Sequence, residues 1–138
     1  MSDRRGRLLV TGTLIGALVL GSLTPAFTTT TTVRLRLPGA NIWRHATVCG
    51  TSTLFKSFPT GQVRLAGSVV PPPAGDFRVR FVAKRCVNGT WTTFRHGHVA
   101  GSLYGSYSGQ FTTALRVRGL VVTFFGGVRS QRRYFTTE

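Results

Sequence analysis

Acidic residues are almost absent from this sequence. Its 138 residues include three, Asp3, Asp76 and Glu138, against 18 lysines and arginines, and the formal net charge is +15. Acid–base hydrolysis of sugars needs two carboxyl groups at a defined separation, and a serine triad needs an acid that orients a histidine. Asp76 falls in an expected turn and Glu138 at the last position, so we expect no enzymatic activity and no catalytic residues.

Metal ligands are scarce as well. The sequence has two cysteines, without the C-x-x-C spacing of a zinc site, and three histidines. His96 and His98 would lie on one face of a strand, and His45 could add a third imidazole. Because carboxylate and further thiolate ligands are missing, we favour exposed histidines over a metal site. We therefore expect neither a metal ion nor a cofactor.

Positive charge and apolar side chains are abundant. Hydrophobic residues make up 41% of the chain and include ten phenylalanines, which is enough to build a core and argues against global disorder. A folded chain with this excess of cations is expected to associate with anionic polymers or surfaces.

The first 26 residues have the pattern of a secretory signal peptide. Three arginines stand among the first seven residues, residues 8–23 are uncharged, and Thr-Pro-Ala then ends at Ala26. The alternative is a retained membrane anchor, although this run is marginal for a hydrocarbon core of about 30 Å. We predict cleavage after Ala26, a threonine-rich tether at 27–32, and a single domain at 33–138, in a protein that is secreted or associated with the cell surface.

The mature part alternates apolar and polar residues with a period of two. FRVRF at 77–81 shows this most clearly, as expected for half-buried strands. Asn88-Gly89 predicts a tight hairpin turn, and Gly67 is a candidate bulge. The spacing indicates an antiparallel sandwich or small barrel of about seven strands. We expect these strands near 33–37, 45–50, 62–70, 77–87, 90–99, 109–117 and 120–136, the last with a possible break at Gly126-Gly127.

Eight cations fall on the polar phase of these expected strands, where they would form rows on sheet faces. We predict that they bind polyanions, against the alternative of a merely solvated outer face. They are Arg34, Arg36, Arg64, Arg78, Arg80, Lys84, Arg116 and Arg118.

The two cysteines are expected to pair. In an exported protein, Cys49 and Cys86 would form a disulfide from two strand segments, whereas in the cytosol they would stay reduced.

Several aromatic residues form a second candidate site. Trp43, Tyr104 and Tyr107 could stack on sugars, with the two tyrosines in an exposed loop. The alternative for the tyrosines is that they are aromatic residues of strands. For Trp91 we favour packing on the disulfide over ligand binding.

Four pieces of the sequence carry a resemblance. GQVRLAGSVVPPPAG, FRVRFVAKRCVNGTW, GSYSGQF and TFFGGVRSQRRYF resemble short immunoglobulin-like sandwich modules of secreted actinobacterial proteins, over Gly61 to Phe135. The resemblance implies an immunoglobulin-like sandwich and supplies no catalytic residues. The cysteine pair and the H-G-H segment depart from it.

These features predict a non-catalytic binding or adhesion module. Its expected partners are anionic cell-envelope polymers or a surface protein. Nucleic acid ranks below them, although Arg129–Arg133 is basic and next to aromatic residues. A cationic toxin or antimicrobial protein that contacts membrane surfaces is the first alternative, and a carbohydrate-binding module is the second.

Overall fold

The computed structural model describes residues 21, 29–39 and 41–138. The expected signal peptide lies outside these residues except for Gly21, as does the start of the tether, so cleavage after Ala26 stays a prediction. In the part of the chain that is described, no helix is long and apolar enough to cross a membrane.

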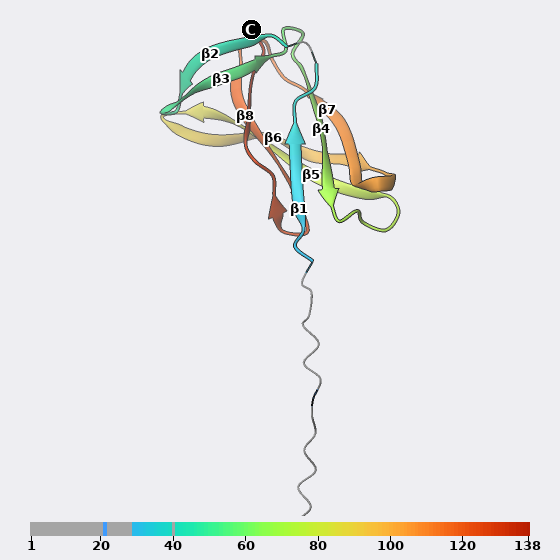
Figure 1. Cartoon of the computed structure of the whole chain (residues 1–138). Coiled ribbons are helices and arrows are strands. Elements are labelled where there is room, and N and C mark those ends of the chain that lie inside the picture. Colours follow the sequence, from blue (N-terminus) through green and yellow to red (C-terminus); the bar gives the residue numbers. More distant parts are fainter. Residues whose placement is uncertain (1–20, 22–28, 40) are drawn as a thin grey trace, which may run out of the picture.

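The described chain is all-β, as expected (Figure 1). Its one helical element is a short 3-10 turn, η1 (Leu103–Gly105). The strands are β1 (Thr32–Arg36), β2 (Trp43–Val48), β3 (Thr51–Ser57), β4 (Gln62–Val70), β5 (Phe77–Val87), β6 (Thr90–Gly101), β7 (Ser106–Thr112), β8 (Arg118–Phe125), β9 (Val128–Arg129) and β10 (Arg133–Thr136).

All ten strands belong to one sheet. The order is β1-β4-β7-β6-β5-β8-β10-β3-β2, and β9 pairs with β8. Neighbouring strands are antiparallel except β10 and β3, which run parallel. β1, at one end of this order, also contacts β8 and β9, so the sheet curls round until its first strand faces its middle (Figure 1).

The expected number of strands was too low. β3 was not anticipated, and in place of the last expected strand at 120–136 the chain forms β8, which begins at Arg118, followed by β9 and β10. Two tight turns, Cys49-Gly50 and Gly126-Gly127, have positive φ at both positions. The break at Gly126-Gly127 was considered above, whereas the turn at Cys49-Gly50 was not expected. Like the predicted Asn88-Gly89 turn, which is confirmed, each of them closes a two-residue hairpin.

The segment 113–117 is not a strand. β7 ends at Thr112, and Arg116 has φ 63° in a turn. Leu115, which lies within the strand expected at 109–117, is 60% exposed. A single residue in the left-handed conformation reverses the chain here and ends the alternation.

The main core lies inside the curled sheet. Apolar side chains from alternate positions of β1, β4, β5 and β7 meet those of β8 and β10. The rings of Phe81 and Phe111 stack at 5.3 Å, and Phe111 meets Phe135 edge-on at 5.6 Å. The alternation in the sequence thus predicts the buried side of most strands.

Gly67 lies opposite Tyr107 in the β4–β7 pair, and the register passes through it without a bulge. A Cβ on Gly67 would meet the Arg34 carbonyl oxygen at 1.9 Å and the Tyr107 hydroxyl oxygen at 2.5 Å. A glycine is therefore required at position 67, because the Arg34 carbonyl and the Tyr107 hydroxyl approach its backbone closely. The bulge in the sheet lies instead between β5 and β6, at Ala83/Lys84.

A second apolar cluster lies outside the main core. Phe55 and Leu120 are fully buried there, and the Tyr134 ring lies 5.4 Å from Phe55 and 6.2 Å from Trp91. This cluster fixes the β2–β3 hairpin to the rest of the sheet, because β3 pairs with β10 at only two register positions.

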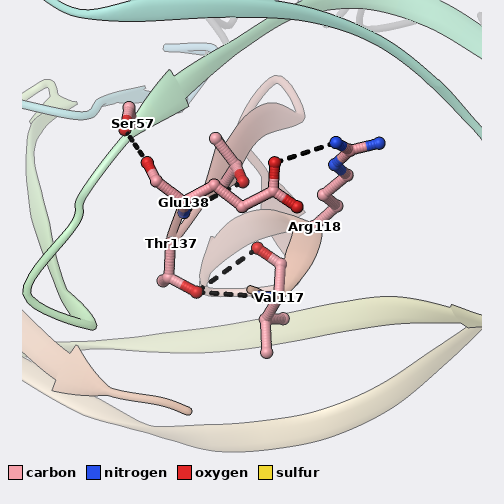
Figure 2. A network of polar contacts seen from close by, with 6 residues as sticks. Ser57, Val117, Arg118, Thr137 and Glu138 are labelled. Atoms are coloured by element: carbon pink, nitrogen blue, oxygen red, sulfur yellow. Dashed lines mark hydrogen bonds and ion pairs between the residues drawn. The ribbon is translucent and has the colours of Figure 1, made fainter. Parts of the chain in front are cut away.

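Polar contacts also hold residues 136–138 (Figure 2). Thr137 Oγ1 accepts from the Val117 amide at 2.9 Å and donates to the Ala114 carbonyl at 2.8 Å. Ser57 donates to the Glu138 carbonyl, and Arg118 pairs with the Glu138 carboxylate at 2.8 Å. Glu138 is thus held between β3 and β8.

Candidate anion-binding groove

The eight cations predicted to bind polyanions fall into three groups. Arg34, Arg36 and Arg64 share the outer face of β1 and β4. A second group, on one face of β5, consists of Arg78, Arg80 and Lys84. The third group is Arg116 and Arg118 at the turn between β7 and β8.

One cation of the third group has an acidic partner. Arg118 forms an ion pair with Glu138, and this is the single ion pair among the residues described. This contact lowers the pKa of the Glu138 carboxyl, mainly through the hydrogen bond from Arg118. In the second group, the Arg80 guanidinium packs 4.6 Å from the centroid of the Phe124 ring, so this side chain is held against the sheet.

Two further cations close the free edge of β1. Lys56 on β3 donates to the Leu37 carbonyl at 2.6 Å, and Arg133 on β10 donates from Nε to the Leu35 carbonyl at 2.8 Å. The Arg133 side chain also reaches the Gln131 amide oxygen at 3.0 Å. Side-chain donors thus satisfy carbonyl groups that another strand would otherwise pair.

A groove of about 760 Å³ opens where these contacts are made, between the end of β1 and the β2–β3 hairpin. Its walls include four cations and two aromatic side chains, and none of its lining residues is acidic. These six residues are Arg36, Lys56, Arg132, Arg133, Trp43 and Tyr134.

Lys56 is the most unusual of them. Its residue is only 6% exposed, and lysine is seldom buried unless its charge is paired. Its ammonium group contacts the Leu37 carbonyl oxygen and the Trp43 ring, whose centroid lies 5.5 Å from Nζ. Neither carries a negative charge. Because an ammonium has three donors, two remain for a group in the groove.

Trp43 is the exposed aromatic surface of the groove. It is paired with Lys56 across the β2–β3 hairpin and is 50% exposed. The ammonium of Lys56 holds the indole from one side through a cation–π contact. Trp43 was predicted as a sugar-binding residue, and the groove places it among cations instead of near the predicted tyrosines.

Those two tyrosines do not join Trp43. Tyr104 is 85% exposed in η1, beside the end of β4 where Val70 pairs with Thr32. The groove begins at Arg36, at the opposite end of β1. Tyr107 is 2% exposed and belongs to the core, so the exposed recognition loop expected at 104–107 presents only one of its tyrosines.

The predicted disulfide between Cys49 and Cys86 is present, with a Cα–Cα distance of 5.6 Å. It joins the tip of the β2–β3 hairpin to the end of β5. Cys49 lies in a turn with φ 50° and not in the expected strand. Trp91 faces Cys86 across the β5–β6 hairpin and is half-buried, in agreement with a packing role.

His96 and His98 lie on one exposed face of β6, opposite Val82 and Arg80. Across the described ranges, no three His, Cys, Asp or Glu side chains are grouped as metal ligands would be.

The sequence interpretation missed three groove cations, Lys56, Arg132 and Arg133. Two of them belong to the basic cluster at 129–133, but nothing in the local sequence indicates that this cluster lies next to β3.

The chain was compared with protein-family models, with curated proteins and with solved structures, and no match was found.

Proposed function

We propose that this protein is a non-catalytic binding module that holds anionic polymers of the cell exterior. One observation carries the proposal: of the 18 cations, 15 lie in the described part, against Asp76 and Glu138 as its acids. With one ion pair among them, most of this charge has no internal partner. Cations on rigid strands attract polyanions without the ordering cost of a flexible tail.

We further infer an immunoglobulin-like arrangement for this module, in which two parts of the curled sheet face each other. The stacking of Phe81 on Phe111 and the contact between Tyr107 and Thr123 support it. The disulfide supports export, because such a bond persists in an oxidising compartment. Export would bring the module to envelope polymers or to an acidic surface protein.

Salt dependence tests the proposal. The oxidised protein should be retained on isolated cell envelopes at low salt and released as salt rises, because exposed charges are screened over about 8–10 Å. Retention that does not change with salt, or no retention, would contradict it. Release of dye from anionic vesicles at low micromolar protein would favour a membrane-active toxin instead.

Matched variants test whether positive charge or the shape of the guanidinium group decides binding. Arg64→Gln/Arg78→Gln should weaken retention, whereas Arg64→Lys/Arg78→Lys keeps the charge and should retain most of it. Equal loss in both pairs would mean that planar guanidinium contacts, and not charge, decide binding.

A further inference from the structure

We propose that the groove between β1 and the β2–β3 hairpin binds an acidic saccharide, a sugar ring that carries a carboxylate, sulfate or phosphate. This inference rests on the proposed function and narrows it from polyanions in general to one class of ligand. It depends on the juxtaposition of an exposed indole with a buried cation, Lys56, that has no acidic partner among the described residues.

The buried Lys56 favours an anionic group in the groove. Lys56 is buried with its ammonium bonded to a neutral carbonyl, and the two acids in the described part of the chain do not line this groove. Desolvating an ammonium without an opposite charge is costly. An anionic group in the groove compensates that cost, and it does so at a donor already fixed in place by Leu37 and Trp43.

Arg133 offers a second fixed donor. Its Nε is bonded to the Leu35 carbonyl and one terminal nitrogen to Gln131, so the guanidinium plane is oriented before a ligand arrives. The donors that remain on its terminal nitrogens can receive a carboxylate, sulfate or phosphate oxygen. Arg36 and Arg132 are exposed on the walls and can follow an anionic chain beyond the groove.

The groove also favours a ligand with a ring. Trp43 is half-exposed and lines the groove. The negative face of an indole attracts the weakly positive C–H groups on the face of a sugar. Asn41 and Thr53 also line the groove and supply both donors and acceptors for hydroxyl groups. The volume of about 760 Å³ lies within the range of small-ligand sites.

These features favour a saccharide over the other anionic polymers. Polyphosphate has charge but no ring for Trp43. A nucleic acid has both charge and rings, but proteins that bind single strands stack several bases on several aromatic side chains. Among the described residues, only two aromatic ones line the groove. Trp43 is half-exposed, and Tyr134 is half-buried with its ring packed on Phe55.

Titration calorimetry with the oxidised full chain tests the inference. The probes are oligogalacturonate, a sulfated oligosaccharide, polyphosphate and single-stranded DNA of equal charge, and a neutral oligosaccharide of equal length. We expect the two acidic saccharides to bind at least about tenfold more tightly than polyphosphate, a preference equivalent to one good aromatic contact.

Trp43→Ala should remove that preference, because it should weaken binding of the acidic saccharides by a larger factor than binding of polyphosphate. Tyr104→Ala is the matched control, because Tyr104 is exposed and lies outside the groove. Arg132→Gln, on an exposed side chain, should weaken all anionic probes by a similar factor. Retention of the disulfide and of the far-ultraviolet spectrum confirms that each variant is folded.

The outcomes separate the two proposals. Equal binding of saccharides and polyphosphate, with Trp43→Ala silent, overturns the saccharide inference and leaves the polyanion module standing. Tighter binding of DNA, or of the neutral oligosaccharide at high salt, also overturns it. Absence of binding to every anionic probe and to cell envelopes overturns both.

Discussion

The hydroxyl of Tyr107 on β7 lies 2.8 Å from Thr123 Oγ1 on β8, across the core, and donates a hydrogen bond to the Arg34 carbonyl on β1. One side chain therefore links the consecutive strands β7 and β8 to β1, whose Arg34 lies 73 positions before Tyr107 in the sequence. The packing that admits it depends on Gly67, which leaves room for the hydroxyl between β4 and β1.

We expect Tyr107→Phe to lower the free energy of unfolding by about 1–3 kcal/mol, because it leaves buried polar groups on Arg34 and Thr123 without their partner. Tyr104→Phe removes an exposed hydroxyl and should have no measurable effect. Urea denaturation of both variants provides the comparison, and equal stability of Tyr107→Phe and the parent would contradict the role given to this hydroxyl.

The ionisation of Tyr107 should lower the stability of the fold at alkaline pH. Burial raises the pKa of Tyr107 above its usual value of 10.0, against a smaller lowering by Thr123. The unfolded chain then loses this proton at a lower pH than the folded one, so this contribution to stability is complete below pH 10 and falls above it. Tyr107→Phe lacks this contribution. The difference in stability between this variant and the parent should shrink as the pH rises above 10, and a constant difference would argue against the raised pKa.

Gly67→Ala should destabilise the fold by about 1–3 kcal/mol or more, because its Cβ would overlap backbone as well as the Tyr107 ring. Ser68→Ala, the next position and on the opposite face of β4, is the control and should be close to neutral. Thermal unfolding measures both variants, and a tolerated Gly67→Ala would mean that β1 and β4 can separate at this point.

Loss of the disulfide should loosen the β2–β3 hairpin. The bridge spans a sequence separation of 37, for which chain entropy gives about 4 kcal/mol. Cys49→Asn/Cys86→Ser is the suitable variant, since asparagine tolerates the positive φ of position 49. Hydrogen exchange should accelerate most in residues 43–57. Because chain entropy acts on the unfolded state, strands that exchange through global unfolding should accelerate as well. Equal acceleration in residues 43–57 and in the other strands would show that the bridge has no additional local effect on this hairpin.

Lys56→Met should affect binding more than stability. A methionine fills similar volume and removes a buried charge without an acidic partner, while one carbonyl loses a donor. We expect unfolding free energy to change by about 1 kcal/mol or less, and affinity for polyanions to fall. Lys56→Arg, which keeps the charge, is the control. A stability loss above about 3 kcal/mol would instead assign Lys56 a structural role.

Local patterns predicted the parts of the fold that local interactions determine. The bounds of β4 and β5 match expectation, because alternation and turn residues suffice to define them. β3 escaped notice because Phe55, Lys56 and Ser57 are all buried, which removes the period of two. The groove was not predictable in this way, because it depends on the parallel pairing of β10 with β3.

The parallel pair has a consequence for the order in which the protein becomes competent. Trp43 and Lys56 are synthesised early, whereas Arg132, Arg133 and Tyr134 follow about eighty residues later. Pairings between such distant segments form slowly. During synthesis the nascent chain would already carry most of its positive charge while still lacking the groove. Selective recognition would therefore begin only once β10 has docked, and until then contacts with polyanions would be purely electrostatic.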